Sequence, residues 1–147
     1  MQPLPKPGIV PLVSHGLSTE FIITAGADQE LMTISGKSTA GNWSHLISRR
    51  AAHMLWYRLT WELFPEKSPR VTGMAATSSM STASNGSVAS HAEVVAEAGT
   101  LSVLGWNAVS RWRFEIDHYN ARQLWAVVDV ALYPAGWEGT SATYNKR

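Results

Sequence analysis

The segment from Trp43 to Phe64 constrains the fold most, because its hydrophobic residues follow helical spacing along two sides rather than one. Asn42 precedes the segment and commonly caps a helix, whereas Pro65 follows it and cannot continue one. We therefore predict one long helix over about residues 43–64. One hydrophobic side of this helix would consist of Trp43, Leu46, Ile47, Met54, Tyr57, Trp61 and Phe64. The other would consist of Ala52, Leu55, Trp56, Leu59 and Leu63.

Two hydrophobic sides leave two arrangements for the predicted helix. It could lie between the sheet and a second helix or the C-terminal tail, which together would enclose it. Alternatively, one side could bind another subunit or a partner protein through Leu55, Trp56, Leu59 and Leu63. Composition is consistent with this second arrangement, because only 16% of the residues are charged and the chain has seven Trp. Both arrangements are consistent with the sequence.

The rest of the pattern predicts an α+β fold. Hydrophobic and β-branched runs predict a hairpin from residues 20–25 and 30–35, and strands at 88–97, 101–104 and 111–117. Asn85-Gly86 is typical of a tight turn, and the Ser/Thr-rich stretch before it could be the partner strand of 88–97 or a mobile loop. A shorter C-terminal helix is expected at about residues 121–132, with Asn120 as its cap. Because short turns join most strands, we expect an antiparallel sheet of about five or six strands with the helices on one face.

The chain length of 147 residues fits one domain. We predict a single domain over residues 1–147, with a proline-rich extended arm at residues 1–12 and a coil tail at residues 135–147. We find no internal repeat in the sequence.

The letters Gly-Lys-Ser-Thr at residues 36–39 resemble part of a nucleotide-binding loop. That motif needs a glycine five residues before Gly36, and Leu31 stands there instead. The predicted helix also begins only after Gly41, rather than at the Lys-Ser pair. We therefore expect residues 36–42 to form a loop that does not hold a nucleotide, although Lys37 and the start of the following helix could bind an anion.

Four basic or imidazole side chains in the predicted helix are candidates for binding a ligand or an anion, namely His45, Arg49, Arg50 and His53. His45, Arg49 and His53 follow one another at four-residue intervals, so a helix would place them on one side. Such a row can bind phosphate or sulfate, although a solvated helix surface is the commoner explanation. The two histidines would lie about 12 Å apart along the helix, which is too far to bind one metal ion.

The other polar residues form no recognisable catalytic arrangement. Arg50 lies among hydrophobic residues, so we expect it to pair with Glu115 or Asp117. Asp117 ends a predicted strand and His118 follows it directly, so the two should point to opposite faces and not act as an acid–base pair. His91, Glu93 and Glu97 would share a sheet face and could bind a metal or transfer protons, but their spacing matches no known site.

The sequence therefore predicts no catalytic residues, no metal and no cofactor. A nucleic-acid surface is disfavoured, because the net charge is +1 and Trp112 should face away from Arg111 and Arg113. The chain has no cysteine, and we recognise no signal peptide or membrane span, so we expect a soluble cytoplasmic protein.

The leading hypothesis is a non-catalytic interaction or assembly protein that binds a protein partner, or forms a homo-oligomer, through the hydrophobic helix face. The alternative is a small-ligand-binding protein or a hydrolase-like enzyme with a cavity between helix and sheet. Its polar groups would include Arg50, His53, His91 or His118.

Overall fold

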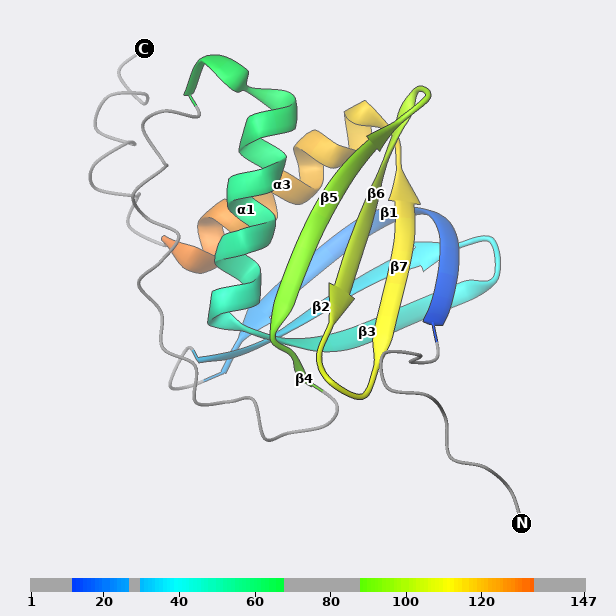
Figure 1. Ribbon diagram of the computed structural model, residues 1–147, viewed down its shortest axis with the longest axis vertical. Coiled ribbons are helices and arrows are strands. Elements are labelled where there is room, and N and C mark those ends of the chain that lie inside the picture. The colour runs from blue at the N-terminus through cyan, green and yellow to red at the C-terminus, as the bar shows by residue number, and fades with distance from the viewer. Residues whose placement is uncertain (1–11, 27–29, 68–87, 134–147) are drawn as a thin grey trace.

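The computed structural model describes residues 12–26, 30–67 and 88–133 (Figure 1). These residues form a seven-stranded mixed sheet and two α-helices, which confirms the α+β class. The strands are β1 (Leu12–Ala25), β2 (Leu31–Ser38), β3 (Gly41–Ser48), β4 (Val88–Ala89), β5 (His91–Glu97), β6 (Thr100–Trp106) and β7 (Arg111–Ile116). The helices are α1 (Arg49–Leu63) and α3 (His118–Leu132), with a short 3-10 helix η1 (Pro65–Lys67) after α1.

The sheet differs from the prediction in strand number and direction. Its order is β4-β3-β2-β1-β7-β6-β5. The pairs β1–β7 and β3–β4 are parallel, and the other neighbours are antiparallel. The hairpin of β1 and β2 was predicted, whereas parallel pairing joins strands far apart in the chain and leaves no local turn signal.

The two ends of this sheet meet. β4 and β5 occupy opposite ends of the strand order, yet only Ser90 separates them in the chain. The Ser90 amide donates to the carbonyl oxygen of Trp106 at 2.9 Å, and Asn107 Nδ2 donates to the carbonyl oxygen of Val88 at 2.6 Å. The sheet therefore curls round, and the strand predicted at residues 88–97 serves both of its ends.

The prediction of a helix from residue 43 is wrong, because residues 43–48 belong to β3. They pair with β2 in the register that places Trp43 opposite Gly36 and Asn42 opposite Lys37. Thr39 and Ala40 form the turn between the two strands, so the Gly-Lys-Ser letters end a strand and do not form a phosphate loop.

The helix caps also differ from those predicted. Ser48, and not Asn42, caps α1, because its side chain accepts a hydrogen bond from the Ala51 amide at 3.0 Å. Asp117, and not Asn120, caps α3 in the same way, by accepting from the Asn120 amide at 2.8 Å.

Both helices lie on one side of the curled sheet, where α1 packs against β5 and α3, and α3 packs against β1 (Figure 1). Leu55 and Leu59 of α1 are 0% exposed and Trp56 is 1% exposed, while Leu63 is partly buried against the same core. The structure thus packs this side of α1 into the core, whereas Trp61 on the other predicted side is 44% exposed. Of the four side chains considered for a partner, three are packed inside the fold and Leu63 is partly buried.

Several sequence predictions fall outside the described residues. These are the proline-rich arm up to residue 11, the Asn85-Gly86 turn with the Ser/Thr-rich stretch before it, and the tail at 135–147. Within the described ranges, neither 15-residue helix is long and apolar enough to cross a membrane.

Candidate ligand-binding groove

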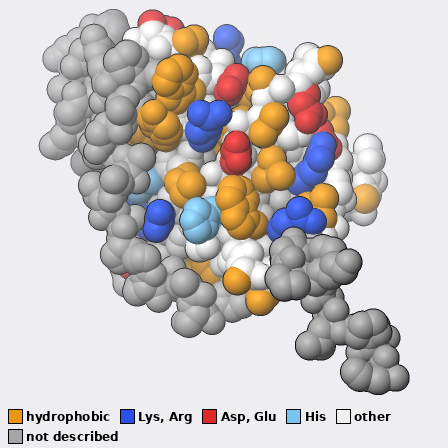
Figure 2. All heavy atoms as spheres, viewed as in Figure 1, with side chains coloured by type: hydrophobic (Ala, Val, Ile, Leu, Met, Phe, Trp, Pro, Cys, Tyr) orange, Lys and Arg blue, Asp and Glu red, His pale blue; other side chains and the backbone are white. Residues whose placement is uncertain are grey.

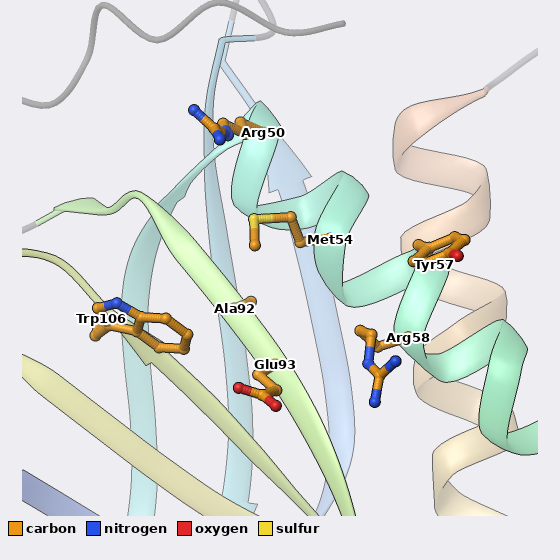
Figure 3. A pocket seen from close by; sticks show the side chains of 7 residues that line it. All are labelled: Arg50, Met54, Tyr57, Arg58, Ala92, Glu93 and Trp106. Atoms are coloured by element: carbon orange, nitrogen blue, oxygen red, sulfur yellow. The ribbon is translucent and has the colours of Figure 1, made fainter. Parts of the chain in front are cut away.

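A groove of about 470 Å³ lies between α1 and the β5–β6 hairpin, which is within the size range of small-ligand sites (Figure 3). Its lining residues are Arg50, Met54, Tyr57, Arg58, Ala92, Glu93 and Trp106. On the face shown in Figure 2, basic and acidic side chains lie among hydrophobic ones over α1, β5 and β6.

Helical spacing places the α1 side chains along the groove. Arg50, Met54 and Arg58 are four residues apart, so they lie above one another on one side of α1. Across from them, Ala92 of β5 is a small residue that leaves room beside Met54. Trp106 and Arg58 flank these two side chains, whereas Tyr57 points to the α3 side of α1 (Figure 3).

The groove carries more positive than negative charge. Arg50 and Glu93 are exposed, and Arg58 is partly buried. Within the described residues, neither arginine has an ion pair to Glu93 or to another carboxylate. Arg58 Nε is buried and has no hydrogen-bond partner in that part of the chain. Part of the Arg58 guanidinium is therefore dehydrated without a compensating acceptor, which favours binding of an anion to its other nitrogens.

The far wall of the groove is held in place by a stacked pair. The rings of Trp106 and His91 are 5.5 Å apart and nearly parallel, with an interplanar angle of 11°. His91 Nδ1 is in turn hydrogen-bonded to Ser90 Oγ at 2.9 Å. The indole therefore forms an ordered hydrophobic surface on which a flat or aliphatic ligand can pack.

The four predicted ligand residues do not gather at one site. Arg50 lines the groove. Arg49 instead donates through Nη2 to the carbonyl oxygen of Leu132 at 2.8 Å, and His53 Nδ1 is 3.1 Å from the Tyr133 hydroxyl. Both therefore hold α1 to the C-terminal end of α3. Burial, and then the charge of Arg49, lower the pKa of His53 to about 4.

His45 lies in β3, so the four-residue row with Arg49 and His53 does not exist. Its Nε2 is 2.8 Å from His15 Nε2, and its ring stacks on Trp112 at 4.7 Å. His15 stacks on Trp43 at 4.9 Å. Burial, and then the neighbouring His15, lower the pKa of His45 to about 4, and burial also lowers the pKa of His15, so both rings are neutral near pH 7.

The predicted pairing of Arg50 with Glu115 or Asp117 is also wrong. Arg113 Nε donates to Glu115 at 2.7 Å, and Asp117 caps α3. Both acceptors are already engaged by nearer groups, since Arg113 is two residues from Glu115 on the same strand face.

The predicted metal alternative gains no support from the described ranges, where no three His, Asp or Glu side chains are placed to hold an ion. Glu97 instead accepts from Ser102 at 3.2 Å and lies 4.0 Å from Arg113, while His91 stacks on Trp106.

Sequence reasoning missed Arg58, Ala92 and Trp106, and it considered Glu93 only beside His91 and Glu97, for metal binding or proton transfer. One local signal existed, because Arg50, Met54 and Arg58 share a side of α1. The other wall depends on which strand packs beside α1, and the sequence does not specify that long-range choice. Comparison with protein-family models, with curated proteins and with solved structures gives no match to this chain.

Proposed function

We propose that this protein is a non-catalytic binding protein that takes a small organic anion in the groove between α1 and the β5–β6 hairpin. The observation that carries the proposal is Arg58, whose partly dehydrated guanidinium has no carboxylate partner among the described residues and lies beside an apolar wall.

The geometry suits a ligand with a charged head and an apolar body. A carboxylate or phosphate would bind the accessible nitrogens of Arg58, with the charge of Arg50 adding attraction along the groove. The apolar body would pack on Met54, Ala92 and Trp106. Glu93 would disfavour a second anionic group at its end of the groove.

A binding role fits this lining better than catalysis. Among the described lining residues, Tyr57 and Glu93 are the groups able to transfer a proton, and Tyr57 points away from the groove centre (Figure 3). The same described lining holds no Ser, Thr or His that could offer a nucleophile next to a base.

The proposal follows the cavity alternative rather than the hydrophobic helix face. Leu55, Trp56 and Leu59 are core residues, so a partner could reach them only by opening the fold. Self-association and cytoplasmic location stay predictions.

The test uses pairs of probes that differ only in charge, namely 1-naphthoate with 1-naphthamide, and decanoate with decanamide. Isothermal titration calorimetry on the full chain should show tighter binding of the acid of at least one pair. Arg58→Met should weaken that binding by about 10- to 100-fold, because a charge-assisted hydrogen bond contributes about 1.5–3 kcal/mol.

Arg122→Met is the matched control, because Arg122 is exposed on α3 and lies outside the groove. It should leave binding unchanged. The proposal fails if acids and amides bind equally, or if the Arg58 and Arg122 variants have the same affinity.

A further inference from the structure

The described elements occur as two similar halves. Each half has consecutive antiparallel strands followed by a 15-residue helix, with β1–β2–β3–α1 in the first and β4/β5–β6–β7–α3 in the second. The helices are offset by 69 residues, from Arg49 to His118. The strand pairs before them share this offset, because Gly36 lies opposite Trp43 and Gly105 lies opposite Trp112.

The first strands of the halves follow an offset of 71 residues, as the two parallel pairings show. Leu17 of β1 lies opposite Glu115 of β7, and Val88 of β4 lies opposite Leu46 of β3. The residue 71 positions after Leu17 is Val88, and the residue 69 positions before Glu115 is Leu46. The first pair therefore corresponds to the second. Each half therefore supplies its first strand to the last strand of the other.

The same correspondence holds for the helix caps. Ser48 accepts from the Ala51 amide, and Asp117 accepts from the Asn120 amide. At the other end, Phe64 and Tyr133 donate to the carbonyl oxygens four residues before them. Both helices thus begin and end in the same way, although their exposed residues differ.

Hydrogen bonds between the halves are reciprocal. Trp56 Nε1 of α1 donates to Asp129 Oδ1 of α3 at 3.0 Å, and Trp125 Nε1 of α3 donates to Thr60 Oγ1 of α1 at 2.9 Å. Trp56 corresponds to Trp125, and Thr60 corresponds to Asp129, each at an offset of 69. This exchange of equivalent contacts is the property of a two-fold interface between identical subunits.

Aromatic contacts show the same reciprocity. Phe64 meets Trp125 edge-on at 5.0 Å, and Tyr133 meets Trp56 edge-on at 5.4 Å. Identical residues at corresponding positions are Gly36/Gly105, Trp43/Trp112, Ile47/Ile116, Ala52/Ala121, Leu55/Leu124, Trp56/Trp125 and Leu63/Leu132. All of them belong to the tight strand contacts or to the helix packing, so a sequence reading without the register did not reveal them.

We infer that the chain is an internal duplication, in which two copies of one βββα unit face each other across a two-fold axis. The surface that each half buries is accordingly an interaction surface whose fitting partner is a second copy of the same unit. This corrects the expectation that the chain has no internal repeat.

One substitution tests the reciprocity directly. Thr60 Oγ1 both accepts from Trp125 and donates to the Trp56 carbonyl oxygen at 2.7 Å. In Asp129→Thr, the new hydroxyl should accept from Trp56 and donate to the Trp125 carbonyl, which repeats the Thr60 arrangement. Asp129→Val has the same shape without an acceptor. The readout is hydrogen exchange of the Trp56 indole N–H, measured by NMR.

The duplication predicts that the hydrogen-exchange protection factor of this proton in Asp129→Thr is within about threefold of the wild-type value. In Asp129→Val, the protection factor should fall by at least about tenfold. Loss of protection in both variants would overturn the inference. Equal protection in both would also overturn it, because the bond would then not hold the halves together.

A second measurement does not depend on that substitution. A site-specific protease sequence inserted within residues 75–80 of the full chain allows it to be cut between the halves. The cut protein should remain a 1:1 complex in size-exclusion chromatography with light scattering, and should re-form after denaturation. Two fragments that separate, or that fail to reassemble, would contradict a dimer-type interface.

Discussion

His53 should make the fold sensitive to mild acid. Its side chain is 8% exposed, contacts the Tyr133 hydroxyl through Nδ1, and lies near Arg49. Burial first, and the charge of Arg49 second, lower its pKa from 6.5 to about 4. The unfolded chain therefore binds a proton more tightly than the folded chain. The stability that neutral His53 provides is complete above pH 6.5 and is lost as the pH falls towards 4.

The size of this loss follows from the shift. Between about pH 7.5 and pH 5.0, one such histidine lowers the free energy of unfolding by up to about 2 kcal/mol, and by about 1 kcal/mol if solvent screens half of the effect. The pKa of His45 is also lowered, so the wild type should lose more stability over this pH range than the titration of His53 alone accounts for. A variant that removes only the His53 titration isolates its share.

His53→Gln is suited to this purpose, because the amide does not titrate and can still form a hydrogen bond with the Tyr133 hydroxyl. Urea unfolding at about pH 7.5, 6.5, 5.5 and 5.0 should show a smaller loss of stability in His53→Gln than in the wild type, by about 1–2 kcal/mol at the lowest pH. His118→Gln is the control, since it removes an exposed imidazole from the start of α3. Equal losses in wild type and His53→Gln would refute the reasoning.

Three further substitutions test other contacts. Gly105→Ala should destabilise the fold by about 1–3 kcal/mol in urea unfolding, because a Cβ there would overlap the Trp112 ring; an unchanged midpoint would contradict that packing. Ser48→Ala should cost about 0.5–2 kcal/mol by removing the α1 cap, and no cost would mean that the Ala51 amide has another acceptor. Glu93→Gln should tighten binding of the organic acid measured for the groove by removing a like charge, and unchanged or weaker binding would contradict that repulsion.

The sequence predicted those elements that depend on residues near one another in the chain. The β1–β2 hairpin, the end of α1 before Pro65 and the C-terminal helix follow from spacing, turns and breakers near each element. Residues 43–48 were assigned to a helix because Trp43, Leu46 and Ile47 extend its hydrophobic spacing. Pairing with β2 decided otherwise, since it places Trp43 against Gly36 and satisfies the backbone of β3.

The candidate site depended on choices that local pattern does not make. Arg50 was identified because a charge among hydrophobic residues demands a reason, and it does line the groove. His45 and Arg49 do not share one side of a helix, because the boundary between β3 and α1 falls between them. Trp106 and Glu93 joined Arg50 only because the β5–β6 hairpin packs beside α1, a long-range contact between distant parts of the chain.

Comparison of the two halves shows which residues of the groove the fold itself does not need. At the positions that correspond to Arg50 and Arg58, the second half has Tyr119 and Val127, and Ile22 of the first half corresponds to Glu93. Since both halves build the same strands, caps and helix contacts, the fold does not require charge at these places. One half can therefore carry charged residues that bind a ligand, while both halves keep the strands, caps and helix contacts of the fold. The double substitution Tyr119→Arg and Val127→Arg then tests whether the corresponding surface of α3 can be made to bind the same ligand.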